Sequence, residues 1–294
     1  MFLSKLSPKA QSLPKAVIAI YLAFTLATGN IVAQDIEDAI VKVVSTINGQ
    51  KYDGIGFAWQ PADANSVYIV TALHLVAGSS AIAIRSPENV KLANATIHKF
   101  VRNADLALLA PENRLGISAL PVYPDSRMPP RGDLWSISKQ NVVSNKMRLG
   151  RQKELFALFK RKRSGNKPMP ALKRQDVSKH FNPHNYPGIG FRILALKEPV
   201  GAGNSGSPIT YRGAAISMVD GGLQNLGGIK KAWWSIPLKK NLTLLWNQGD
   251  TNAGALKAYT RQNGRILFSK PRDQNQRMFA QSSGESGIAL YLTD

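Results

Sequence analysis

The chain has 294 residues and a hydrophobic content of 44%, which excludes an intrinsically disordered protein. It holds 38 Lys and Arg residues against 18 Asp and Glu residues, a formal net charge of +20. This charge fits either an anionic partner or a basic surface that keeps the protein soluble. Because the chain has no cysteine, disulfides, a cysteine-ligated zinc site and a thiol nucleophile are excluded.

The N-terminus has the pattern of an export signal. Three lysines and no acid precede the apolar stretch Ala16–Ala27, which small residues follow. This order predicts a signal peptide over residues 1–33, cleaved after Ala33 or Gly29. An uncleaved N-terminal membrane anchor is the alternative, since Ala16–Ala33 only just reaches the length that spans a bilayer. Both interpretations place the remaining chain outside the cytoplasm, in the periplasm or secreted.

Short apolar runs alternate with turn residues through the middle of the chain, which is typical of many short strands. Long helices do not alternate with these runs, so a barrel or sandwich is favoured over a doubly wound α/β sheet. After residue 245 the chain becomes polar, and we expect residues 246–294 to form a C-terminal extension of unknown role. The clearest strand-like runs are 54–59, 66–71, 80–84, 105–109, 134–137 and 190–196, with further apolar patches at 265–268 and 287–291.

Residues 146–185 form a basic insertion, rich in Lys and Arg, in which Glu154 and Asp176 are the only acids. The run Lys160–Arg163 could bind an anion, be a site of self-cleavage or be a solvated loop. No named nucleic-acid-binding motif occurs in the chain, so we do not expect specific binding of nucleic acid.

Three segments hold the residues of a nucleophilic site. His74 ends a strand-like run, Asp105 stands just before an apolar strand, and Ser205 lies in the glycine-rich turn Gly201–Pro208. A serine hydroxyl needs a base to take its proton, imidazole titrates in the useful range, and a carboxylate fixes the imidazole tautomer. Glycine beside the serine lets the backbone aim N–H groups at an oxyanion, and we assign this oxyanion hole to Gly203 and Ser205.

The order of these residues separates two classes of hydrolase. All four histidines precede Ser205. An α/β-hydrolase needs its histidine after the nucleophile, and Ser207 stands where the second glycine of its motif belongs. The order His, Asp, Ser is instead that of the chymotrypsin arrangement.

The blocks around these residues resemble those of the trypsin-like (chymotrypsin-fold) serine proteases. Thr71–His74, Asp105–Leu109 and Gly203–Pro208 are similar to their Thr-Ala-(Ala/Ser)-His, Asp-(Ile/Leu)-Ala-(Leu/Val)-Leu and Gly-Asn-Ser-Gly-(Gly/Ser)-Pro blocks. Trp233–Pro237 stands where they often have Phe-Ala-Ile-Pro. The likeness covers about residues 36–245 and is greatest to cysteine-free bacterial members such as the Deg-type and glutamyl endopeptidases.

This resemblance implies an all-β fold of two six-stranded β-barrels with the active site between them. The protease domain would span residues 34–245, with barrel one at about 36–128 and barrel two at about 129–245. His74 and Asp105 would come from barrel one and Ser205 from barrel two.

The resemblance also implies that substrate lies along Ser217, Met218 and Val219. The preferred cleavage residue is not implied, because Pro199 stands where an acid would mark cleavage after Arg or Lys, with Glu198 adjacent. Glutamyl endopeptidases use a histidine that follows the serine, and this chain has none.

Two functions follow as hypotheses. The first is a serine endopeptidase that cleaves protein or peptide substrates through an acyl-enzyme on Ser205, with His74 as general base, Asp105 orienting it and no cofactor. The alternative is a catalytically inactive protease-like scaffold that binds an anionic polymer or membrane surface through the 146–185 insertion.

A metal site is not expected from the remaining histidines, which are His98, His180 and His184. The last two have helical i, i+4 spacing, but Pro183 between them argues against a helix, and no zinc motif surrounds them.

Overall fold

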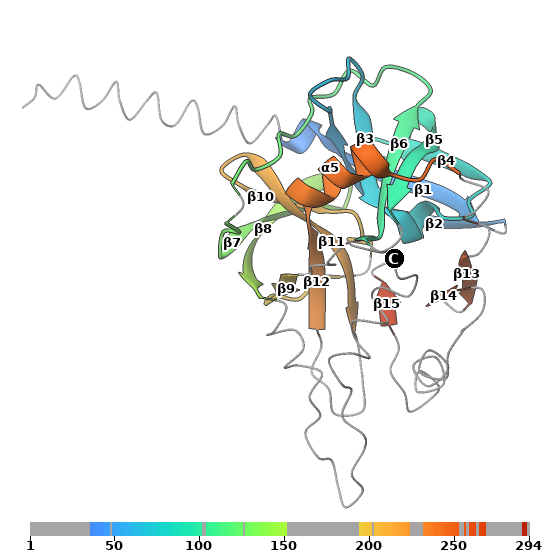
Figure 1. Cartoon of the computed structure of the whole chain (residues 1–294). Coiled ribbons are helices and arrows are strands. Elements are labelled where there is room, and N and C mark those ends of the chain that lie inside the picture. Colours follow the sequence, from blue (N-terminus) through green and yellow to red (C-terminus); the bar gives the residue numbers. More distant parts are fainter. Residues whose placement is uncertain are drawn as a thin grey trace, which may run out of the picture.

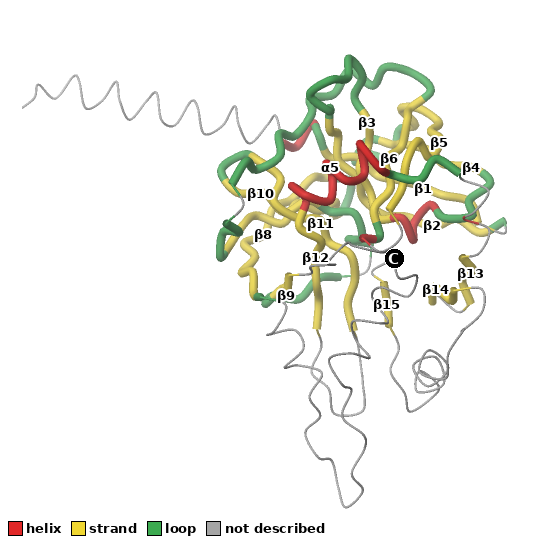
Figure 2. Tube along the Cα trace, in the orientation of Figure 1, coloured by secondary structure: helices red, strands yellow, loops and turns green. Residues whose placement is uncertain are grey.

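The computed structural model describes residues 36–47, 49–101, 104–125, 127–151, 194–201, 203–223, 232–252, 256, 259–262, 265–268 and 290–292. In this part of the chain two antiparallel β-barrels lie side by side with few helices (Figures 1 and 2). The predicted signal peptide, residues 1–33, and the part of the basic insertion after Arg151 lie outside the described residues.

Barrel one closes from six antiparallel strands in the order β1-β2-β3-β6-β5-β4. Its strands alternate buried and less buried residues where one face meets the core, as in β1, whereas Leu106–Leu109 of β6 are buried on both faces. The short helix α2 (Leu73–Val76) follows β3 directly. The strands are β1 (Ile40–Ile47), β2 (Gln50–Trp59), β3 (Tyr68–Ala72), β4 (Ala81–Arg85), β5 (Lys91–Val101) and β6 (Leu106–Pro111).

Barrel two is a sheet in the order β10-β7-β8-β9-β12-β11, and the pairing of β10 with β11 closes it into a ring. A further strand, β15 (Leu290–Leu292), lies on β11 outside the ring. The predicted fold of two six-stranded barrels is therefore confirmed. The strands of the ring are β7 (Arg131–Ser138), β8 (Asn141–Gly150), β9 (Leu194–Leu196), β10 (Pro208–Tyr211), β11 (Ala214–Leu223) and β12 (Ala232–Pro237).

One hydrophobic core joins the barrels. Met218 of β11 and Trp234 and Ile236 of β12 belong to the same buried cluster as the interior of barrel one. Their neighbours Ile216 and Trp233 belong instead to the separate interior of barrel two. Burial of each large apolar side chain contributes about 1.5–3 kcal/mol, so these two strands hold the barrels in a fixed relation.

The end of the main body lies beyond the expected boundary at residue 245. Helix α5 (Leu238–Gln248) buries Leu238, Leu242 and Leu245, and the backbone groups of Asp250 pair with those of Phe100. Strands β13 (Tyr259–Gln262) and β14 (Arg265–Phe268) form a separate hairpin.

The basic insertion also begins later than expected, because residues 146–150 complete strand β8. Lys146 Nζ lies 2.6 Å from Asp133 Oδ1 on the paired strand β7, and Arg148 bonds Glu198 through both its backbone N–H and its side chain. Lys146 and Arg148 therefore form ion pairs within barrel two.

Candidate active site

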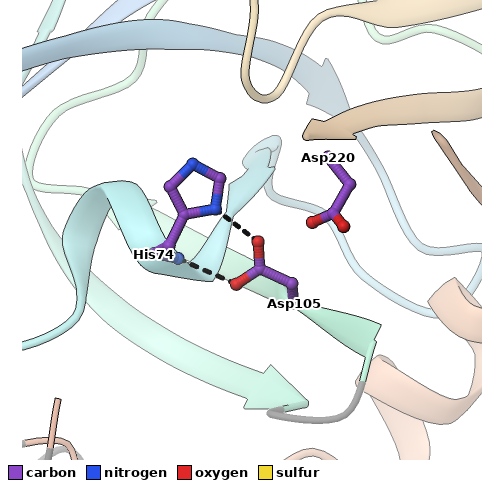
Figure 3. A group of neighbouring side chains, drawn as sticks. All are labelled: His74, Asp105 and Asp220. Atoms are coloured by element: carbon purple, nitrogen blue, oxygen red, sulfur yellow. Dashed lines mark hydrogen bonds and ion pairs between the residues drawn. The ribbon is translucent and has the colours of Figure 1, made fainter. Parts of the chain in front are cut away.

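Asp105 fixes the position of His74 through three hydrogen bonds. The backbone N–H of Leu73 donates to the Asp105 carbonyl oxygen at 2.8 Å, and the backbone N–H of His74 donates to Asp105 Oδ1 at 2.9 Å. The His74 ring nitrogen Nδ1 bonds Asp105 Oδ2 (Figure 3). Asp105 takes a left-handed φ of 46°, a conformation that aspartate tolerates better than most residues. The start of α2 and the imidazole are thus set by one residue just before β6.

The turn that carries Ser205 is held against barrel one. The backbone N–H of Ile55 in β2 donates to the Ser205 carbonyl oxygen at 2.9 Å, and the Thr71 hydroxyl of β3 donates to the Ile55 carbonyl oxygen at 2.7 Å. Gly206 has φ +87°, and a Cβ there would lie 1.8 Å from the Ile55 carbonyl oxygen. Only glycine fits this position, and this explains why a glycine follows Ser205.

The three predicted residues meet between the barrels. His74 Nε2 lies 2.9 Å from Ser205 Oγ. Because the Nδ1 side of the ring bonds a carboxylate, the proton of the neutral ring is assigned to Nδ1, and Nε2 is left to accept from the Ser205 hydroxyl. This geometry supports proton transfer from a serine hydroxyl to imidazole.

His74 and Ser205 are both buried, at 1% and 0% exposure.

Asp220 is a residue of this site that sequence reasoning missed. It lies in β11, it is 3% exposed, and its carbonyl oxygen is 3.5 Å from Ser205 Oγ. Its Oδ2 accepts a 2.5 Å hydrogen bond from Trp234 Nε1. The available signal was a single acid, close after the serine, in a strand with no other charged residue.

The environment of Asp220 favours its neutral form. Burial raises the pKa of its carboxyl group well above the usual range, and the charge of Asp105 and the hydrogen bond with it add to this rise. His74 and the Trp234 hydrogen bond act in the opposite direction but do not outweigh it.

The ligand atoms of His74, Asp105 and Asp220 lie within 4.8 Å of one another, close enough for a metal ion to be considered. The Nδ1 atom of His74 and both carboxylate oxygens of Asp105 take part in hydrogen bonds. We therefore interpret the group as a hydrogen-bonded network.

The oxyanion donors remain a prediction. Gly203 has a positive φ of 83°, which the turn before the serine requires and which suits glycine.

The strand expected to hold substrate, at Ser217, Met218 and Val219, is paired on both sides. On one side Ser217 and Met218 pair with β10 and Val219 exchanges backbone bonds with the serine turn, while all three pair with β12 on the other side. Both edges of the strand are therefore occupied at these three residues. The edge away from β12 separates from β10 only at Gly221, where β15 lies.

Two other residues considered from the sequence have structural contacts elsewhere. His98 stacks on Tyr68 with ring centroids 5.0 Å apart, and burial, with the nearby Lys99 charge, lowers its pKa. Glu198 is engaged by Arg148. His180 and His184 lie outside the described residues.

Comparison with known proteins places this geometry in a fold class. No family model matches the sequence, and no curated protein matches it. Among solved structures the chain is similar to the Rv3671c protease from M. tuberculosis in its active form, at 16% identity over 86% of this chain and 98% of that one, with a TM-score of 0.50. It is also similar to the HtrA-type protease AlgW with tripeptide, at 14% identity and a TM-score of 0.50, over 73% of this chain and 61% of that one.

These likenesses show that the protein has the double-barrel fold of the trypsin-like serine proteases. The resemblance predicted from the three sequence blocks is confirmed at the level of the fold.

Among the described helices, none is both long and apolar enough to cross a membrane.

Proposed function

We propose that the protein is a serine endopeptidase that hydrolyses peptide bonds through an acyl-enzyme on Ser205. The observation that carries the proposal is the relay from Ser205 Oγ to His74 Nε2 at 2.9 Å and from His74 Nδ1 to Asp105, assembled from distant segments of two barrels. The similar solved structures are those of proteases, which supports the same reaction class.

The first half of the reaction forms the acyl-enzyme. Ser205 Oγ attacks the carbonyl carbon of the scissile bond while His74 Nε2 takes its proton, and Asp105 stabilises the imidazolium that results. The N–H groups of Gly203 and Ser205 would stabilise the oxyanion. The C–N bond then breaks, and His74 returns its proton to the departing amine.

Water completes the reaction. His74 takes a proton from the water as its oxygen attacks the acyl carbon, and the ester bond to Ser205 breaks with return of the proton to Oγ. These steps use side chains and backbone groups of this chain and need no cofactor.

Protein or peptide substrates would pair with the backbone of Gly221–Leu223 on the edge that β15 occupies. An extended peptide adds to an exposed sheet edge through main-chain hydrogen bonds, and this stretch follows directly after Asp220, whose carbonyl oxygen lies near Ser205 Oγ. The same proposal assigns residues 34–245, together with the last turn of α5, which ends at Gln248, to a protease domain of an exported protein.

A serine-directed fluorophosphonate tests the proposal, together with hydrolysis of casein. Wild type should label, and Ser205→Ala should lose labelling and at least about 10³-fold of its hydrolysis. Ser207→Ala is the matched control, because this serine lies in the same turn and is equally buried. Unlabelled wild type that does not cleave casein would overturn the proposal and favour the non-catalytic scaffold.

A further inference from the structure

We propose that Asp220 is a positioning residue for this site, with a carboxyl group that retains its proton and donates it in a hydrogen bond to the carboxylate of Asp105. The inference deepens the proposed function and rests on it for its catalytic consequence. Its structural part, a neutral acid beside Asp105, stands separately.

The geometry brings two carboxyl groups together in a buried place. The Asp220 side chain turns toward Asp105 from β11 (Figure 3), and their oxygens lie within 4.8 Å. Trp234 Nε1 donates to Asp220 Oδ2, whereas Asp220 Oδ1 is buried and no N–H or O–H group of the described residues donates to it. A proton on Asp220 that is shared with Asp105 removes this defect, because a protonated carboxyl group is a donor.

Electrostatics requires that one acid of the pair be neutral. Two carboxylates this close cannot both ionise in a buried site without a large cost. The titratable groups that face Asp220 are Asp105, which raises its pKa, and His74, which lowers it. Trp234 of β12 supplies an uncharged donor.

The proton belongs on Asp220 rather than on Asp105. The Asp105 carboxylate accepts from both the backbone and the ring of His74, and its side chain is 18% exposed. Asp220 is almost fully buried, and within the described part of the chain its carboxyl group accepts a hydrogen bond from Trp234 alone. Hydrogen bonds to an ionised carboxylate favour ionisation, so Asp105 is the charged partner.

The consequence is a chain of hydrogen bonds from β12 to the serine. Trp234 orients Asp220, Asp220 holds the carboxylate of Asp105, and Asp105 holds the imidazole that faces Ser205. Asp220 does not touch the reacting atoms through its side chain, so it acts by keeping Asp105 and His74 aligned.

Two substitutions test whether the site needs a hydrogen-bond donor at position 220 or specifically a carboxylic acid. In Asp220→Asn the amide N–H₂ can donate to Asp105 while its oxygen accepts from Trp234, so kcat/KM for a peptide substrate should stay within about threefold. Asp220→Leu keeps the branching at Cγ but removes the donor, and kcat should fall about 10- to 100-fold with little change in KM.

The pH profile of fluorophosphonate labelling tells the positioning role from a merely structural one. If Asp220 is neutral, Asp220→Asn exchanges one neutral donor for another, and the acid limb set by His74 stays in place. If Asp220 is ionised, its removal takes a negative charge away from His74, and the limb shifts to lower pH. That shift would overturn the proposal.

An infrared measurement tests the proton without any activity. Protein carrying ¹³C-carboxyl aspartate should show a protonated carboxylic-acid C=O band at neutral pH in wild type and in Ser205→Ala, and Asp220→Asn should lack it. Absence of the band from wild type would overturn the inference even if the enzyme is active. A band present in a protein that neither labels nor cleaves would leave the neutral acid intact and sink the proposed function instead.

Discussion

The backbone N–H of Ile55 in barrel one donates to the carbonyl oxygen of Ser205 in barrel two at 2.9 Å. The next residue, Gly206, packs against the carbonyl group of Ile55, and the Thr71 hydroxyl donates to that carbonyl oxygen. The proposed nucleophile is thus positioned by strand β2 of the barrel that also carries its base. Small changes at this contact should affect the site and the packing of the two barrels together.

Gly206→Ala should disable the site. A Cβ would lie 1.8 Å from the Ile55 carbonyl oxygen, and the positive φ of +87° costs a non-glycine residue about 1–2 kcal/mol before any overlap. We expect fluorophosphonate labelling to be lost and the urea midpoint to fall.

Gly116→Ala is the matched control for this change. Gly116 has a similar φ of +67°, but a Cβ there would meet nothing within 4 Å. Gly116→Ala should lower the free energy of unfolding only by the cost of a positive φ, and fluorophosphonate labelling should be retained. Equal effects of the two substitutions would show that contact with Ile55 is unimportant.

Thr71→Val should loosen the same contact with little change in shape. The variant removes the donor of a buried 2.7 Å hydrogen bond and leaves the Ile55 carbonyl oxygen without that partner, at a cost of about 1–3 kcal/mol in the free energy of unfolding. Urea unfolding measures the loss. Thr243→Val removes a comparable hydroxyl bond on the exposed side of α5 and should cost less.

The fold and the three residues of the relay could be predicted from the sequence because short blocks carry them. The histidine, aspartate and serine each come with a local pattern, and their order separates this arrangement from an α/β-hydrolase. Gly206 illustrates the limit of such patterns: the sequence shows the glycine, but only the contact with Ile55 explains it.

Features that depend on pairing between distant segments could not be predicted in the same way. The sequence of β11 does not reveal that β10 and β12 occupy both edges at Ser217 and Met218, and this pairing is the reason that we propose Gly221–Leu223 as the substrate edge. The pKa of Asp220 is raised first by its burial between paired strands and then by Asp105, which lies beside it from the other barrel.

The raised pKa of Asp220 predicts a pH dependence of stability. Above the ordinary carboxyl pKa the unfolded chain has lost the Asp220 proton and the folded protein keeps it, so the folded state binds more protons. The free energy of unfolding therefore falls as pH rises, by at most about 1.4 kcal/mol per pH unit, until the folded pKa is passed.

Asp220→Asn removes this term, so its stability relative to wild type should increase as pH is raised from about 4 to about 7. Urea unfolding across this range measures the difference. The exposed Asp63→Asn variant reports the background of an aspartate-to-asparagine change. A difference between Asp220→Asn and wild type that does not vary with pH would contradict the raised pKa.

Strand β15 occupies the edge that a peptide substrate would need. Leu292, Tyr291 and Leu290 pair antiparallel with Gly221, Gly222 and Leu223, next to the buried Ser205. If this edge binds substrate, molecules with β15 in place cannot bind it. The apparent affinity is then the intrinsic affinity multiplied by the fraction of molecules in which β15 has left the edge. Removal of residues 288–294 should therefore lower KM for a peptide substrate by about three- to tenfold and speed fluorophosphonate labelling.

Removal of residues 293–294 alone is the control, because it leaves all of β15 in the chain. This variant should keep the KM of the full chain, since the pairing with β11 uses residues 290–292. If the longer truncation leaves KM unchanged, substrate does not compete with β15 for this edge. If it lowers kcat instead, β15 supports the site, because the loss would then follow from removing a strand that stabilises Gly221–Leu223 rather than from opening their edge.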